Sequence, residues 1–110
     1  MRRVLVSCLY VEEGREYRPG VVELYEQRVV NYHPLGDDDL ALAEWLGGAI
    51  FLSGEEKENI PDNLTLEELK SFFYSSSEYK CYAYHLPVRV YESGGCIPLS
   101  SIVQLEDDDY

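Results

Sequence analysis

The segment that most constrains the fold is a nearly continuous apolar run near the start of the chain, from Val4 to Val11, which reads VLVSCLYV. Its β-branched residues favour a strand, and the run is too short for a stable helix. The turn-forming sequence EEGR at residues 12–15 ends the run. Because continuous apolar runs are typical of strands inside a sheet, this segment predicts a central strand.

Other segments also have the composition of strands. Val21 to Tyr32 contains two β-rich halves, VVELY and RVVNY, on either side of Glu26-Gln27, which predicts a hairpin with a tight polar turn. From Tyr79 to Leu86 the side chains would alternate between two faces that both carry aromatic residues, which indicates an interior strand. Further short strands are expected at Ala49–Leu52, Val88–Tyr91 and Ile97–Leu105.

A capping box gives the strongest helical signal. Thr65 is followed three residues later by Glu68, and Leu64 and Leu69 have the spacing of a hydrophobic staple. A helix with one apolar face is therefore expected from Leu66 to Tyr74.

A second, shorter helix is expected at Leu40–Leu46. Asp37–Asp39 precede it and offer N-cap oxygens and negative charge at the positive end of the helix dipole. Gly47-Gly48 follows and supplies a stop, because glycine adopts the left-handed conformation without a Cβ penalty.

Together these elements predict an α+β fold: a mainly antiparallel sheet of five to seven strands, with two short helices covering one face. The expected order of elements is β-β-β-α-β-α-β-β-β. Its runs of consecutive strands distinguish it from an alternating parallel α/β fold. Residues 1–105 are expected to form a single globular domain, and residues 106–110 an acidic C-terminal tail.

The chain is strongly acidic, with 21 Asp and Glu residues, 9 Lys and Arg residues and a net charge of -12. Such a charge repels phosphate groups, so direct binding to nucleic acid or anionic lipid is not expected. No apolar run approaches the roughly 20 residues that span a bilayer. The cysteines are 3 in number and irregularly spaced, which fits reduced thiols and predicts a soluble, cytoplasmic protein.

The sequence contains no recognisable catalytic or metal-binding motif. Cys81 and His85 would lie about 13 Å apart on an extended strand, too far for one zinc ion with bonds of roughly 2.0 to 2.3 Å. Cys96 follows two glycines, but nothing around it indicates the lowered pKa that a reactive thiol needs. We therefore predict no catalytic residue, no metal site and no cofactor.

Tyrosine is the unusual residue type, with 10 in the chain. A group of tyrosines in the C-terminal strands predicts a recognition surface, because tyrosine combines a large apolar area with a polar tip. Cross-strand packing within the sheet is the alternative role for these residues. The candidate binding residues are Tyr79, Tyr82, Tyr84 and Tyr91.

Three functions are compatible with these patterns. The first is a small, acidic, non-enzymatic module that binds an unidentified protein partner. The second is a small-molecule-binding protein or small enzyme, with tyrosine hydroxyls, His85 and Cys96 in a pocket between sheet and helices. The third is a DNA mimic that inhibits a nucleic-acid-binding protein, which requires the acidic runs to gather on one face.

Overall fold

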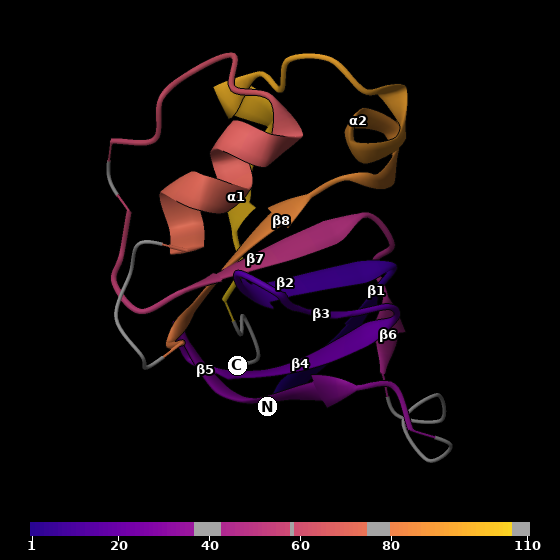
Figure 1. Ribbon diagram of the computed structural model, residues 1–110. Coiled ribbons are helices and arrows are strands. Elements are labelled where there is room, and N and C mark those ends of the chain that lie inside the picture. The colour runs from indigo at the N-terminus through magenta and orange to yellow at the C-terminus, as the bar shows by residue number, and fades with distance from the viewer. Residues whose placement is uncertain (37–42, 58, 75–79, 107–110) are drawn as a thin grey trace.

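The computed structural model describes residues 1–36, 43–57, 59–74 and 80–106, which form strands, two α-helices and one 3-10 helix (Figure 1). The helices are α1 (Leu66–Tyr74) and α2 (Val88–Ser93), and the 3-10 helix is Leu99–Ser101. The strands are β1 (Arg2–Val6), β2 (Cys8–Glu12), β3 (Arg15–Tyr17), β4 (Gly20–Tyr25), β5 (Arg28–Pro34), β6 (Glu44–Trp45), β7 (Ala49–Ser53), β8 (Tyr82–Leu86) and β9 (Val103–Gln104).

The strands form two sheets. The first sheet has the order β5-β4-β1-β6, and the second has the order β3-β2-β7-β8-β9. β1 runs parallel to β6 and β2 runs parallel to β7, whereas the other neighbours are antiparallel. The α+β class is therefore confirmed, and the expected single sheet of five to seven strands is corrected to two mixed sheets of four and five strands.

Ser7 divides the apolar run from Val4 to Val11 between the two sheets, so the prediction of one continuous strand is wrong. The backbone N–H groups of Ser7 and Cys8 both donate to the carbonyl oxygen of Gly48, at 3.0 and 3.2 Å. Gly48 lies where the chain passes from β6 in the first sheet to β7 in the second. The two crossings therefore lie side by side, and this keeps β1 parallel to β6 and β2 parallel to β7.

The second sheet is the middle of three layers, with the first sheet on one face and the helices on the other (Figure 1). Its strands divide their side chains between two cores, as the period of two in a strand requires. In β8, Ala83 belongs to the core between the sheets, whereas Tyr82, Tyr84 and Leu86 belong to the core beneath the helices. The alternation predicted for this segment is confirmed.

α1 spans Leu66–Tyr74 as predicted, and its capping box is formed. Thr65 Oγ1 accepts a hydrogen bond from the Glu68 N–H at 3.2 Å, and the Glu68 carboxylate accepts one from the Thr65 N–H at 3.1 Å. Phe73 is buried and stacks on both Phe51 and Tyr84, with ring centroids 5.2 and 5.0 Å apart. Aromatic packing therefore fixes the helix on the second sheet.

The two strands predicted after Pro87 are not formed as expected. Residues Val88–Ser93 form α2, in which the Pro87 carbonyl accepts hydrogen bonds from the N–H groups of Val90 and Tyr91. The sequence VRVY fits either period, and a proline with fixed φ suits the start of a helix. Between residues 97 and 105 the chain forms the 3-10 helix and the short β9, because Pro98 cannot donate to a strand ladder.

No helix in the described part of the chain is long and apolar enough to cross a membrane.

Two predictions for the first sheet have different outcomes. The hairpin within Val21–Tyr32 is confirmed, with β4 and β5 joined at Glu26-Gln27. The prediction of a helix at Leu40–Leu46 is wrong at Glu44–Trp45, because these residues form β6. Residues 40–42 lie outside the described residues. Pairing with β1 overrides the local helical pattern at Glu44–Trp45.

Candidate binding cleft

The structure does not gather the predicted tyrosines into one exposed surface. Tyr84 is buried, with 2% of its surface exposed, and its hydroxyl accepts a hydrogen bond from the Lys57 N–H at 2.6 Å. Tyr82 and Tyr91 are half-buried and pack against the core beneath the helices. Tyr79 lies outside the described residues. The described members of the set therefore contribute mainly to packing.

A cleft of about 360 Å³ lies between α1 and the hairpin formed by β2 and β3, and we call it the hairpin–helix cleft. The helical residues that line it recur at spacings of three and four, so they share one face of α1. Each wall carries carboxylates. The cleft is lined by Glu13, Gly14, Glu16, Glu67, Lys70, Ser71 and Tyr74.

The hairpin wall is built by a tight turn between β2 and β3. Gly14 has a φ of 79°, which glycine adopts without the steric cost that other residues incur. Arg15 Nη1 forms a salt bridge with Glu12 Oε1 at 3.1 Å across the turn. Glu16 lies directly opposite Tyr10, so the two side chains share the face that α1 covers. EEGR predicted only the end of a strand, although a turn containing glycine before REY is also a hairpin signal.

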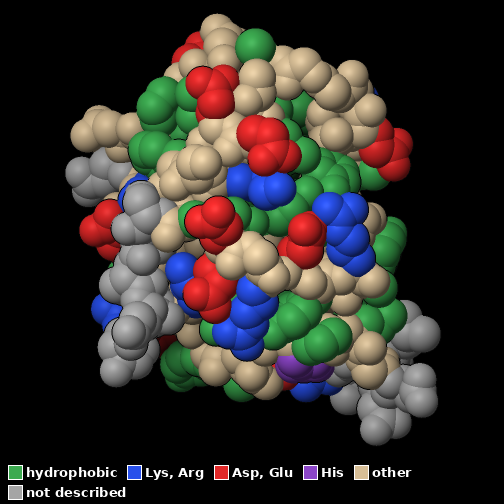
Figure 2. Space-filling model, in the orientation of Figure 1, with side chains coloured by type: hydrophobic (Ala, Val, Ile, Leu, Met, Phe, Trp, Pro, Cys, Tyr) green, Lys and Arg blue, Asp and Glu red, His purple; other side chains and the backbone are tan. Residues whose placement is uncertain are grey.

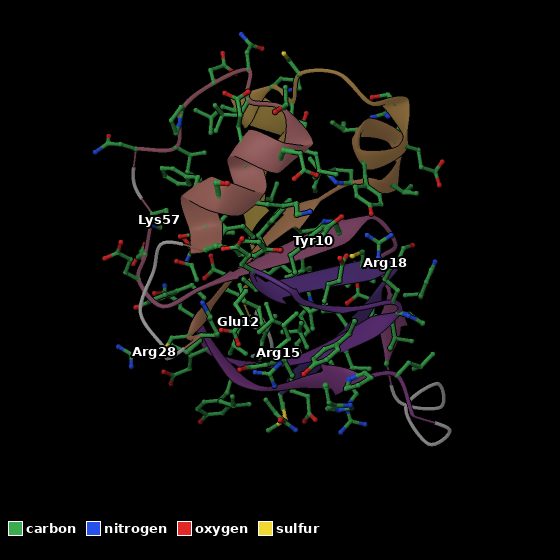
Figure 3. The ribbon with its side chains drawn as sticks, viewed as in Figure 1. Tyr10, Glu12, Arg15, Arg18, Arg28 and Lys57 are labelled. Carbon is green, nitrogen blue, oxygen red and sulfur yellow. The ribbon has the colours of Figure 1, made fainter. Side chains whose placement is uncertain are left out.

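Polar side chains from both strands and from α2 meet beside the cleft. Two residues of this group, Tyr10 and Arg18, are labelled in Figure 3. Arg18 Nε and Nη2 donate to Glu16 Oε2 at 2.9 and 2.6 Å, and the Cys8 thiol donates to the same oxygen at 3.3 Å. The hydroxyl groups of Tyr10 and Tyr91 are 2.9 Å apart. The hydrogen bonds from Arg18 and Cys8 restrain the position of the Glu16 carboxylate.

The pKa shifts of four groups in and beside the cleft, Cys8, Tyr10, Glu16 and Tyr74, all favour the ordinary protonation states of these groups at neutral pH. Burial raises the pKa of the Cys8 thiol, and burial together with the hydrogen bond to Tyr91 raises the pKa of Tyr10. The Arg18 guanidinium lowers the pKa of Glu16. Burial, and then the nearby carboxylate of Glu16, raises the pKa of Tyr74 to about 12. None of these shifts produces a thiolate or a base that is half-protonated near pH 7.

The charges that line the cleft are predominantly negative. The lining includes three carboxylates, from Glu13, Glu16 and Glu67, and the single ammonium group of Lys70. Lys70 Nζ forms a salt bridge with Glu67 at 3.4 Å and lies 5.2 Å from the centre of the Tyr10 ring. Within the described ranges Glu13 makes no salt bridge. Acidic and basic side chains alternate on this face of the molecule, with hydrophobic side chains between them (Figure 2).

The other candidate residues do not meet at the cleft. His85 Nε2 donates a hydrogen bond to the carbonyl oxygen of Gly47 at 3.0 Å. Because His85 follows Tyr84 in β8, its side chain lies on the opposite face of the second sheet from Tyr84. Cys96 is exposed and Cys81 is half-buried, and both are free thiols. Among the residues that the structure describes, no group of three or more His, Cys, Asp or Glu side chains is placed to hold a metal ion.

The fold and the cleft together define a small α+β protein with two stacked mixed sheets, whose second sheet is covered by helices beside an acidic cleft. No protein-family model, curated protein or solved structure matches this chain. Its function has to be inferred from the geometry and charge of the cleft.

Proposed function

We propose that this chain is a small, non-enzymatic module that binds a protein partner, and that the hairpin–helix cleft accepts a basic side chain of that partner. One observation carries the proposal: three carboxylates and one ammonium group line a single concave site. Glu16 is paired with Arg18 and Glu67 with Lys70, so the excess negative charge comes from Glu13, and a lysine or arginine side chain would compensate it.

The size of the cleft favours a side chain over a large cofactor. Its volume of about 360 Å³ is near the lower end of the roughly 300 to 1,000 Å³ typical of ligand pockets. The hairpin wall is braced, since Glu16 is held by Arg18 and the hairpin turn is bridged by Arg15 and Glu12. A braced site loses little conformational entropy when it binds, which favours recognition by a small surface.

The directions of the pKa shifts support binding in preference to catalysis. A nucleophilic cysteine needs a lowered thiol pKa, whereas that of Cys8 is raised. A general base works best with a pKa close to neutrality, whereas the pKa of Glu16 is lowered and that of Tyr74 is raised. The cleft therefore offers fixed charges and hydroxyl groups.

Titration with short capped peptides tests this proposal. We expect peptides with a central Lys or Arg to bind in isothermal titration calorimetry, and matched peptides with Glu or norleucine not to bind. Replacing Glu13 and Glu67 together by Gln should weaken binding about twofold to thirtyfold, because each exposed ion pair contributes roughly 0.2 to 1 kcal/mol. The control is Glu26→Gln, which removes one negative charge from the β4–β5 turn, away from the cleft.

Two results would contradict the proposal. One is equal binding of the Lys and norleucine peptides, which would show that the carboxylates do not select charge. The other is an unchanged affinity in the double variant, which would place the peptide somewhere other than the cleft. Binding should also weaken as salt is added, because exposed charges are screened.

A small cationic molecule is the second candidate ligand, because the cleft volume also suits a compound with a single amine group. A thermal-shift screen of amines and amino acids would reveal such a ligand as a rise in melting temperature. DNA mimicry is a weaker alternative, since carboxylates alternate with arginine and lysine on the face in Figure 2. Asp37–Asp39 and Asp107–Asp109, on which that hypothesis also depends, lie outside the described residues.

A further inference from the structure

A second depression lies on the other side of the N-terminal part of α1, and we call it the interhelix pocket. It has a volume of about 280 Å³ and lies between α1 and α2. Most of its walls are aliphatic, aromatic or glycine residues, in contrast to the hairpin–helix cleft. The pocket is lined by Thr65, Leu66, Glu67, Val90, Tyr91, Gly94, Gly95 and Ile97.

Backbone contacts position the segments that form the walls of this pocket. Ile97 pairs with Leu64 in an isolated bridge, and the Ile97 N–H donates to the Leu64 carbonyl oxygen at 2.8 Å. Gly94 ends α2 with a φ of 72°, and Gly95 follows with a φ of 75°. A Cβ atom at either glycine would meet no atom within 4 Å, so this wall leaves room for an incoming side chain.

The interhelix pocket and the hairpin–helix cleft are neighbouring sites, because they share Glu67 and because Tyr91 of the pocket contacts Tyr10 beside the cleft. Glu67 lines both sites. Tyr91 lines the pocket, and its hydroxyl bonds to Tyr10, whose ring lies under Lys70 of the cleft. A ligand of a few residues that occupies one site therefore has the other within its reach.

We propose that the partner segment carries an apolar residue next to its basic residue, with the basic side chain in the hairpin–helix cleft and the apolar side chain in the interhelix pocket. This inference rests on the proposed function and names the kind of sequence that the module recognises. Charge complementarity selects the first residue, and burial of apolar area selects the second.

The test compares four capped peptides that differ only at two central positions: Lys-Leu, Leu-Lys, Lys-Ser and norleucine-Leu. Leu-Lys is included because the peptide could bind in either chain direction. We expect Lys-Leu or Leu-Lys to bind about tenfold more tightly than Lys-Ser, because burying most of a leucine side chain is worth roughly a factor of ten. Norleucine-Leu should bind about twofold to thirtyfold more weakly than the best peptide, which is the loss expected for two exposed ion pairs.

The pocket variant is Val90→Thr, which keeps the shape of the side chain and replaces one methyl group of the pocket wall with a hydroxyl group. It should reduce the advantage of Leu over Ser to about twofold. Val88→Thr is the matched control, because Val88 lies in the same helix but does not line the pocket. If Val90→Thr fails to fold by circular dichroism, Leu66→Ala tests the opposite wall with the same expected loss.

The outcomes separate the two proposals. If Lys-Ser binds and neither Leu peptide binds more tightly, the interhelix pocket is not a subsite, and the proposed function stands. If the Leu advantage persists in both pocket variants, the apolar residue binds elsewhere and this inference is overturned. If no Lys peptide binds, or if norleucine-Leu binds as tightly as Lys-Leu, the proposed function itself is overturned.

Discussion

Replacing Gly48 by alanine should destabilise the protein, because Gly48 lies where several backbone segments meet at the crossing between the sheets. Gly48 has a φ of 67°, a conformation that residues with a Cβ rarely adopt. An added Cβ would overlap the carbonyl oxygen of Leu86 and lie 2.8 Å from the Val88 nitrogen and 2.9 Å from the Pro87 carbonyl carbon. All these atoms belong to the backbone, so rotation of a side chain cannot relieve the overlap.

The expected loss of stability has two contributions. The left-handed conformation costs alanine about 1 to 2 kcal/mol relative to glycine. Overlap with a packed backbone adds about 1 to 3 kcal/mol, the usual range for overpacking. Gly48→Ala should therefore lower the free energy of unfolding by about 2 to 5 kcal/mol. At Gly14, with a φ of 79°, an added Cβ meets no atom within 4 Å, so Gly14→Ala should incur only the conformational part.

Urea denaturation followed by circular dichroism measures both losses, provided that the slope m is the same in both variants. The difference between the two variants isolates the effect of the overlap from that of the conformation. Losses that agree within about 0.5 kcal/mol would refute the reasoning, because they would mean that β7 and the segment after β8 do not approach each other closely at Gly48.

Two further predictions concern α1. Thr65→Ala removes the N-cap oxygen that accepts the Glu68 N–H, and should lower the free energy of unfolding by about 1 kcal/mol in the same urea assay; Thr65→Ser should retain most of that stability. Tyr74 has a pKa raised to about 12, so the folded state holds its proton more tightly than the unfolded state does. The stability that this contributes is present below about pH 10 and is lost as the pH rises towards 12. Tyr74→Phe should therefore show a smaller loss of stability between pH 9 and 11 than the wild type, whereas Tyr25→Phe, at an exposed position, should match the wild type.

Elements that are stabilised by local contacts could be predicted from the residues alone. α1 begins at its capping box, and both partners of that box lie within four consecutive residues, Thr65 to Glu68. The β4–β5 hairpin closes through a tight turn between two β-rich segments, so its pairing is also a short-range choice. The alternation in β8 was predictable for the same reason, because a strand places successive side chains on opposite faces whatever it pairs with.

Contacts between residues that are distant in sequence set where the apolar run divides and where the cleft forms. The strand break at Ser7 depends on the carbonyl oxygen of Gly48, which is distant in sequence. The segment VRVY after Pro87 fits either a strand or a helix, and none of the strands among the described residues pairs with it. The cleft requires the β2–β3 turn to lie beside one face of α1, although neither segment alone indicates a binding site. Long-range packing decides such features because the local patterns leave the alternatives close in free energy.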